Sequence, residues 1–296
     1  MTKSPADSSR DIAPFYRPLV RLLVALVGIL GGAIIPSARA AAPDIKTLPT
    51  ATKDVPFVNT LGMKFVPVPG TKALFSVWET RVQDYQAFVD AKKHTWEKPK
   101  FEQGPTHPAV YVSYEDAVAF CQWLTEKEGF AAQGLAYRLP MDAEWSAAVG
   151  LLGEEGATPG EKESNAPQDV YPWGTAWPPP PRAGNFADAT AKKVGSGMFY
   201  VDGDYGDGFT YTSPAGLFKE NAYGLFDLSG NVWEWCADWR NANKTAHVLR
   251  GASWGSSTRS DLLSSCRKGV RPGGRSGYCG FRCVVAPADG ALLPRP

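Results

Sequence analysis

Apolar residues recur at helical spacing in three segments of the chain. The first predicted helix follows Thr80, whose hydroxyl can cap its start, with Gln83 three residues on as the capping-box partner. One face of this helix is apolar. Its apolar positions are Val82, Tyr85, Phe88 and Val89.

A second predicted helix begins at Ser113 and ends by Gly129, a residue suited to a helix C-terminus. It also carries an apolar stripe, which places Cys121 on the core face. The stripe consists of Ala117, Val118, Cys121 and Leu124.

The third predicted helix opens within the segment Arg138-Leu139-Pro140-Met141-Asp142-Ala143-Glu144-Trp145. Met141 occupies the position where a Ser or Thr cap is expected. Its presence should cost this helix about 1 kcal/mol relative to a good cap.

Strand patterns are fewer and shorter. Residues 63–70 alternate weakly and stop at a turn, and residues 280–285 read as a buried strand. Residues 153–216 show little regular pattern and a run of prolines at 178–181. A segment of that length inside a compact domain needs something to hold it, and bound ions are the simplest answer. We therefore expect an α+β domain rich in loops.

The segment 221–235 combines glycines, carboxylates and large rings. Gly224 and Gly230 permit unusual backbone conformations, and Asp227 and Glu234 supply hard oxygen donors. Calcium accepts six to eight such oxygens in flexible geometry, so the segment indicates a calcium-stabilised loop. A turn followed by an ordinary Trp-rich strand is the alternative. Under either interpretation, Trp233 and Trp235 would point to one face if this part of the segment is extended.

A second acidic segment, 202–209, also resembles a calcium loop. It does not match an EF-hand, because Gly206 stands where the third acidic ligand is expected. A solvated acidic turn is the alternative interpretation.

The N-terminus resembles an export signal. Four basic residues precede an apolar run at 22–35, and Ala38-Arg39-Ala40 supplies a small-x-small cleavage pattern. We expect cleavage after Ala40, because the apolar run is too short to span a bilayer comfortably. The predicted organisation is a signal peptide at 1–40, a linker at 41–54, one domain at 55–288 and a tail at 289–296. The mature protein would be periplasmic or secreted, with no stable membrane span.

Composition narrows the function further. The chain of 296 residues has a formal net charge of +1 and no basic block, which argues against a nucleic-acid partner. Five cysteines in an exported chain can form disulfides, with at least one left over. Only His94, His107 and His247 are present, and no two of them have metal-ligand spacing. Isolated histidines of this kind are mostly structural.

Four ordered motifs resemble the formylglycine-generating enzyme (sulfatase-modifying factor) family, over residues 55–288. They are Arg138-Leu139-Pro140 with Glu144-Trp145, Tyr171-Pro172-Trp173-Gly174, Gly230-Asn231-Val232-Trp233-Glu234-Trp235, and Arg250-Gly251-Ala252-Ser253-Trp254 with Gly280-Phe281-Arg282. The resemblance implies a single loop-rich α+β domain, related to C-type-lectin-like folds, with two structural calcium ions. Residues at the family's ligand positions are Asn185, Phe186, Asp207 and Phe209 for the first ion, and Asp227, Gly230, Val232 and Glu234 for the second.

The resemblance also implies a disulfide between Cys121 and Cys283. The family's other bridge maps onto Cys266, but its partner position holds Val149. Cys266 can instead pair with Cys236 or Cys279, and the sequence leaves these alternatives open.

The chain departs from the family at the active site. The aerobic family enzyme binds Cu(I) through two cysteines, and those positions hold Ser256 and Asp261 here. Cu(I) is a soft ion that prefers thiolates, so copper is an unlikely cofactor. By resemblance, Trp233 and Ser253 would line the substrate cleft beside these two residues. A Ser256–Asp261 nucleophile pair is disfavoured, since no histidine can be assigned to it.

Two hypotheses follow. The first is an exported, calcium-stabilised domain whose cleft binds a peptide, a glycan or a partner protein. The second is an oxidoreductase of the formylglycine-generating or pyoverdine-maturation type, which would modify a peptide or a metabolite without thiolate-bound copper. The pyoverdine-maturation branch is similar in its export and in lacking the copper cysteines. The ergothioneine-synthase branch is disfavoured, because its iron ligands require a histidine motif that this chain lacks.

Overall fold

The described part of the chain is rich in loops and contains two small β-sheets and several short helices. The structure is a computed structural model and describes residues 48–193, 199–201 and 203–288. These belong to a compact unit, Ala42–Pro296. The predicted signal peptide and tail, and part of the predicted linker, lie outside the described residues. None of the described helices is long and apolar enough to cross a membrane.

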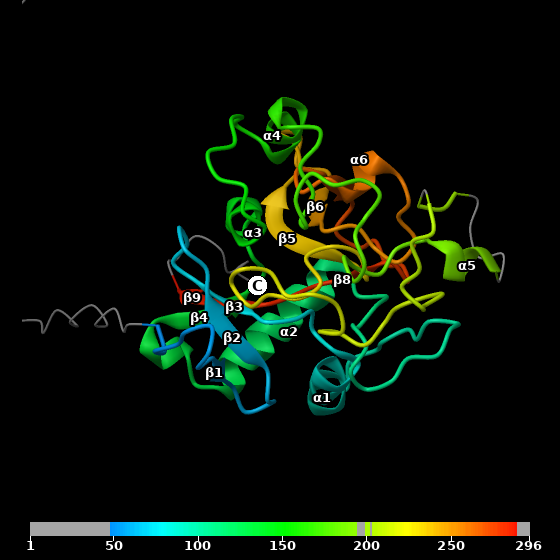
Figure 1. Cartoon of the computed structure of the whole chain (residues 1–296). Helices are drawn as coiled ribbons and strands as arrows, with labels where there is room; N and C mark the ends of the chain where they lie inside the picture. Colours follow the sequence, from blue (N-terminus) through cyan, green and yellow to red (C-terminus); the bar gives the residue numbers. More distant parts are fainter. Residues whose placement is uncertain (1–47, 194–198, 202, 289–296) are drawn as a thin grey trace, which may run out of the picture. The chain divides into compact units, whose positions relative to one another are not determined.

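The larger sheet is antiparallel, with strand order β1-β2-β3-β9-β4 (Figure 1). The C-terminal strand β9 lies between β3 and β4, which both come from the N-terminal half of the chain. The strands are β1 (Phe57–Val58), β2 (Lys64–Pro67), β3 (Leu74–Ser76), β4 (Leu135–Arg138) and β9 (Val284–Pro287). The strand predicted at 63–70 is therefore confirmed as β2.

The second sheet has the order β7-β6-β5-β8, and its β5–β8 pair is parallel. Its strands are β5 (Trp233–Trp239), β6 (His247–Arg250), β7 (Lys268–Val270) and β8 (Cys279–Gly280). The strand predicted at 280–285 is divided between the two sheets, because β8 ends at Gly280 and β9 begins at Val284. The short link between them carries Arg282 into the interior.

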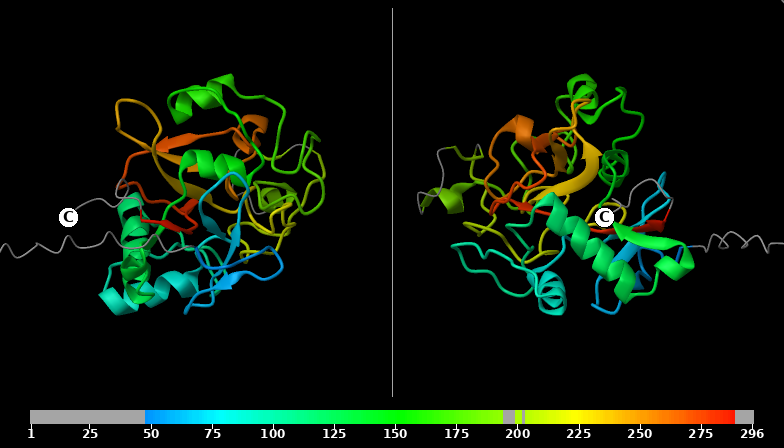
Figure 2. Two further views of the ribbon diagram at one scale, coloured as in Figure 1. Left: turned by 90° about the vertical axis from the view of Figure 1, so that its left-hand side faces the viewer. Right: turned by 180° about the vertical axis from the view of Figure 1, so that it is seen from behind.

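The helices are α1 (Val82–Lys92), α2 (Tyr114–Lys127), α3 (Asp142–Ala148), α4 (Pro159–Asn165), α5 (Ala189–Lys193) and α6 (Arg259–Leu262), with a 3-10 turn η1 (Ala131–Gln133). Helix α2 packs against β4 and α1, and α3 packs against β5 (Figure 2). The segment 153–216 contains only α4 and α5 among its described residues, as the loop-rich interpretation predicts.

The helix caps confirm two of the three sequence predictions. Ser113 caps α2 through the N–H of Asp116. The first helix starts one residue later than expected: Arg81 is its N-cap and Asp84, not Gln83, accepts the backbone N–H of Arg81. Thr80 fails as a cap because its N–H donates to the Phe281 carbonyl, which fixes it as buried extended chain.

Met141 is the N-cap of α3 and makes no side-chain cap, as expected. A distant residue compensates. Asp238 of β5 accepts the N–H of Asp142 at 2.6 Å, satisfying one donor of the first turn and placing negative charge at the helix N-terminus.

Both sheets are covered on their two faces, by two clusters of buried apolar residues. Phe65, Leu74 and Val285 face the cluster that contains α2, whereas Val66, Phe75 and Val284 face the cluster that contains Trp145. Strand β5 alternates in the same way: Trp233 and Trp235 share the first cluster, as predicted, and Cys236 belongs to the second. Several polar residues are also fully or nearly fully buried, among them Asn185, Asp227 and Glu234.

Candidate functional site

The residues predicted for the first calcium ion lie together. The carboxylate of Asp207 accepts the backbone N–H of Phe186 at 2.8 Å and that of Phe209 at 2.7 Å. Asn185, next to Phe186, is fully buried, and its Oδ1 has no hydrogen-bond partner among the described residues. A buried amide oxygen without a partner is costly, and a bound cation would satisfy it.

Negative charge accumulates at this position. The N–H of Asp207 donates to the carboxylate of buried Asp188. Burial raises the pKa of Asp207 to about 7, and Asp188 adds to the rise, although the two backbone donors oppose it. Within the described residues, neither carboxylate forms an ion pair with a basic side chain. The other acidic residues of the predicted 202–209 loop do not join them: Asp204 is exposed, and Asp202 lies outside the described residues.

The second predicted set is built on a turn with left-handed backbone at Asp227, Gly230 and Asn231. Asp227 is 4% exposed; one carboxylate oxygen accepts the N–H of Gly216, and Oδ1 has no partner in the described structure. Glu234 is fully buried and forms two bonds with Arg282, at 2.7 and 2.6 Å. Its charge is therefore already balanced by a guanidinium.

A third buried carboxylate, Glu79, faces the same turn. It accepts the side-chain amide of Asn231 at 2.6 Å and the N–H of Val232 at 3.2 Å. Burial raises the pKa of Glu79 well above its usual value, and the nearby Asp227 and Glu234 raise it further. Burial also raises the pKa of Asp227 to about 6. Three buried carboxylates thus share one guanidinium, that of Arg282.

These donor sets suit calcium better than a transition metal. Among the described residues, no three His, Cys, Asp or Glu side chains converge on a point that could hold a metal ion. A cation at either set would therefore need amide and backbone carbonyl oxygens, which calcium accepts. The unpartnered oxygens of Asn185 and Asp227 are consistent with that requirement.

The two positions that hold copper ligands in the resembled enzyme have other partners here. Ser256 is 3% exposed, and its Oγ accepts the N–H of Ser253 at 3.2 Å. Asp261, in the first turn of α6, pairs with Lys268 at 3.3 Å. The hydroxyl and the carboxylate therefore belong to different contacts.

The predicted cleft residues Trp233 and Ser253 are buried, and both adjoin segments that carry aromatic rings. Lys268 Nζ lies 4.6 Å from the ring centroid of buried Trp233, and the backbone N–H of Trp233 donates to the Tyr278 carbonyl. Beside Ser253, the Trp254 ring contacts three other rings. Together they form what we call the aromatic face: Phe101, Tyr211, Trp254 and Tyr278.

The aromatic face is open to solvent at its edges. Tyr211 is 39% exposed and Tyr278 is 43% exposed, while Trp254 beneath them is 6% exposed. The indole N–H of Trp254 donates to the Gly277 carbonyl at 2.8 Å, which fixes the ring. Sequence reasoning identified Trp254 only as part of a motif and missed the other three rings, since they come from distant segments.

All five cysteines are buried free thiols. The Cys121 and Cys283 sulfur atoms lie 3.5 Å apart, so the structure brings together the pair expected to form a disulfide, and the bond itself stays a prediction. Cys236 lies in the second apolar cluster, whereas Cys266 and Cys279 lie in the first. Cys266 thus shares a cluster with Cys279 and not with Cys236. No bond to either is formed in the structure, and both pairings stay predictions.

Each histidine has a structural partner. His94 contacts Asp116 at 3.1 Å, and His107 contacts the Thr212 hydroxyl at 3.1 Å. His247 stacks on Tyr114 with ring centroids 3.5 Å apart. These contacts agree with the structural interpretation of the isolated histidines.

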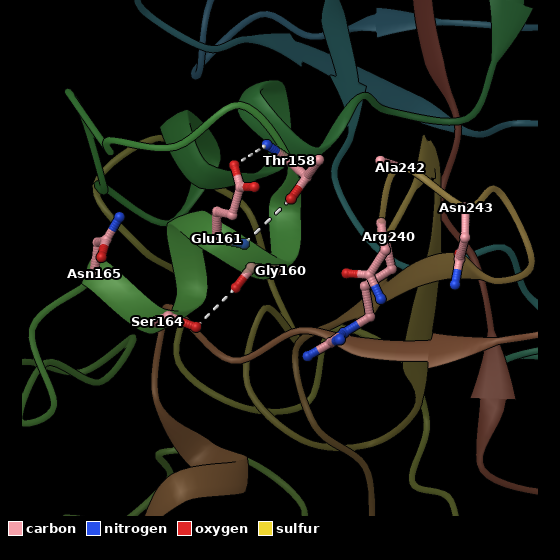
Figure 3. A pocket seen from close by; sticks show the side chains of 9 residues that line it. Thr158, Gly160, Glu161, Ser164, Asn165, Arg240, Ala242 and Asn243 are labelled. Carbon is pink, nitrogen blue, oxygen red and sulfur yellow. Dashed lines mark hydrogen bonds between the residues drawn. The ribbon is translucent and has the colours of Figure 1, made fainter. Parts of the chain in front are cut away.

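A separate polar groove of about 560 Å³ lies between α4 and the loop that follows β5 (Figure 3). Arg240 lies at one side of it, facing the helix that carries Glu161 and Ser164. None of the predicted cation or cleft residues lines this groove.

Comparison with known proteins identifies the family. The sequence profile of the Sulfatase-modifying factor enzyme 1-like domain (FGE-sulfatase) matches residues 56–287. The chain belongs to this family. A formylglycine-generating enzyme of Thermomonospora curvata is 29% identical over 244 residues, which cover 74% of this chain and 69% of that protein.

Not all relatives in the family are described as active. A protein of Bos taurus named inactive C-alpha-formylglycine-generating enzyme 2 is 31% identical over 228 residues, covering 72% of this chain and 62% of its own length. Among solved structures, PvdO from Pseudomonas aeruginosa superposes with a TM-score of 0.52 at 22% identity, covering 82% of this chain and 90% of that one. This likeness supports the loop-rich α+β fold.

The family motifs meet in the interior. Trp145 of the first motif donates its indole N–H to Glu234 of the third at 3.0 Å, and Glu234 pairs with Arg282 of the last. Arg250 bonds Asp142 at 2.5 Å and lies 4.4 Å from the centroid of the Trp145 ring. Residues from three of the four motifs therefore meet in one buried polar framework.

Proposed function

We propose that this protein is an exported, calcium-stabilised member of the FGE-sulfatase family that works without copper and binds a ligand at its cleft. The observation that carries the proposal is the identity of Ser256 and Asp261 and the contacts that they make. Oxygen donors with partners of their own, Ser253 and Lys268, occupy the positions where the family enzyme has its thiolates. Cu(I) has no soft ligand at these positions.

Calcium is proposed on the basis of the buried acidic groups. The first site would use the side chains of Asn185 and Asp207 with the carbonyls of Phe186 and Phe209. The second would use Asp227 and Glu234 with the carbonyls of Gly230 and Val232. When bound, the ions would neutralise carboxylates that the protein otherwise leaves with one guanidinium and a few backbone donors.

The aromatic face supports a binding role. Four rings that pack on one another hold two tyrosines partly in solvent next to Ser253, and a rigid aromatic surface costs little conformational entropy on binding. A peptide, a glycan or a partner protein would bind there. The inactive relative in Bos taurus supports the idea that the family scaffold persists without catalysis.

The second candidate function is oxidation of a peptide or metabolite. Its support is the formylglycine-generating enzyme of Thermomonospora curvata, at 29% identity. A catalytic member would need a metal or a cofactor held by groups other than the two thiolates.

One experiment separates the two. The purified protein is given Cu(I) or Fe(II) and a cysteine-containing sulfatase peptide, while oxygen consumption and peptide mass are followed. We expect no formylglycine and no oxygen use above the metal-only control. The double variant Ser256→Cys, Asp261→Cys serves as a comparison, since it places thiols at the two copper-ligand positions of the family enzyme. Sustained, protein-dependent oxygen use with a change in peptide mass would overturn the binding function.

A further inference from the structure

Asn231 lies between the two proposed calcium sites and is fully buried. It follows Gly230 and precedes Val232, the two residues whose carbonyls belong to the second site. Its own backbone is left-handed, with φ of 59°, which asparagine tolerates better than most residues. Its side chain bonds residues on both sides, Asn185 of the first site and Glu79 beside the second.

On the side of the first site, Asn231 holds Asn185 through two bonds. Its backbone N–H donates to the Asn185 carbonyl at 2.9 Å, and its Oδ1 accepts from Asn185 Nδ2 at 3.2 Å. Asn185 Nδ2 donates its other hydrogen to the Tyr211 carbonyl at 2.8 Å. Both amide hydrogens of Asn185 are then used. Its Oδ1, which has no hydrogen-bond partner among the described residues, is left as the oxygen that could bind a cation at the first site.

On the side of the second site, Asn231 and Val232 are held by one carboxylate. Glu79 accepts Asn231 Nδ2 through one oxygen and the Val232 N–H through the other. These two bonds fix the backbone that carries the proposed carbonyl ligands. Glu79 is not one of the family's ligand positions, and sequence reasoning did not single it out.

The same residue reaches the aromatic face. The Asn231 carbonyl accepts the N–H of Trp254 at 2.8 Å, while Asn185 holds Tyr211 as described above. A network of buried, mutually satisfied hydrogen bonds behaves as a unit, because moving one member leaves the others unpaired.

We propose that Asn231 is a positioning residue that couples the two calcium sites, so that occupation of one site raises the affinity of the other. The proposal rests on the calcium sites proposed above. A cation at the first site would fix Asn185, Asn185 would fix Asn231, and Asn231 with Glu79 would hold the second site ready. Coupling of this kind is reciprocal: each ion changes the affinity for the other by the same factor.

The test is a calorimetric titration of the calcium-stripped protein with calcium chloride. Asp207→Asn disables the first site and Asp227→Asn disables the second, so each variant reports the affinity of the remaining site alone. We expect each remaining site to bind about tenfold more weakly than in the unsubstituted protein, by an equal factor in the two variants.

Asn231→Gly keeps the left-handed backbone and the two backbone bonds but removes the side chain. In this variant, disabling one site should leave the affinity of the other unchanged. Ser213→Ala is the matched control, since it removes only a 3.3 Å hydroxyl bond to Asn231 Oδ1 and keeps the 2.9 Å backbone bond from the same residue. It should retain the coupling.

The outcomes are distinct. Two binding events whose affinities do not respond to loss of the other site would overturn the coupling and leave the calcium sites standing. Absence of any calcium binding would overturn both. If Asn231→Gly does not fold, Glu79→Gln takes its place, since it replaces one of the two oxygens that accept from Asn231 and Val232; a coupling factor unchanged in Glu79→Gln would then overturn the proposal.

Discussion

Arg282 and Glu234 form a fully buried ion pair, joined by two bonds of 2.7 and 2.6 Å between the two sheets. Arg282 also donates to the carbonyls of Ser76 and Phe226. One guanidinium thereby connects the larger sheet, the 221–235 segment and β5. The final Gly-Phe-Arg motif of the family has a structural explanation in these four contacts.

Replacing Arg282 should destabilise the protein strongly. Arg282→Met removes the positive charge and leaves Glu234 buried without its partner, which costs about 3–5 kcal/mol. Urea unfolding in buffer with EGTA, where no bound ion can replace the guanidinium, measures the change in the free energy of unfolding. Lys92→Ala, which breaks the exposed pair with Glu126, is the control and should change stability by less than about 1 kcal/mol. Equal effects of the two substitutions would contradict the assignment.

The Asp142 carboxylate should make the free energy of unfolding fall as the pH drops below about 4. Burial raises its pKa, but Arg250 and Arg267 outweigh burial and hold the folded-state pKa below its usual value. Because the folded pKa is depressed, this stability is present above the unfolded value and is lost as pH falls through the folded value.

Asp142→Asn removes that dependence along with the charge. Urea midpoints between pH 3 and pH 7 should show a lower, flatter profile in the acid range for the variant than for the unsubstituted protein. Parallel profiles for the two proteins would show that this carboxylate is not the group that titrates.

Calcium removal should lower the melting temperature. EGTA would leave Asp207 and Asp227 without a neutralising ion in buried surroundings, and a ligand that binds only the folded state stabilises it by mass action. Asp207→Ala and Glu234→Ala should each melt lower in calcium and respond less to EGTA, as followed by thermal unfolding. An unchanged melting temperature of the unsubstituted protein in EGTA would refute the calcium sites.

Oxidation should join Cys121 to Cys283. In denaturant without reductant, alkylation followed by mass spectrometry should leave Cys121 and Cys283 unlabelled, and should label both only after reduction. The bridge would link α2 to the residue directly before β9, and its loss should cost about 2–4 kcal/mol. Labelling of all five cysteines without reductant, in protein secreted into an oxidising compartment, would contradict the pairing.

Local patterns predicted the regular elements well where they depend on neighbours in sequence. Ser113 and Met141 were located as helix N-caps because capping is a local property. Thr80 was misassigned as a cap because its hydrogen bond to Phe281 is a contact between the two ends of the chain. The division of the C-terminal strand is likewise non-local, since it depends on Arg282 turning inward to meet Glu234.

The site was only partly visible in the sequence. The resemblance to the family located Asn185, Asp207, Asp227 and Glu234, but nothing in the pattern around Glu79 distinguished it from a surface acid. Its burial and its partners, Asn231 and Val232 in a distant part of the chain, are visible only in the structure. The aromatic face was not predictable, because its four rings come from separate loops.

The metal content of the purified protein tests the central claim most directly. After incubation with excess calcium and Cu(I) and removal of free metal, elemental mass spectrometry should find calcium in excess of protein and copper well below one atom per chain. Stoichiometric copper that survives dialysis, or calcium no higher than in an EGTA-treated sample, would contradict a calcium-stabilised scaffold without a copper centre.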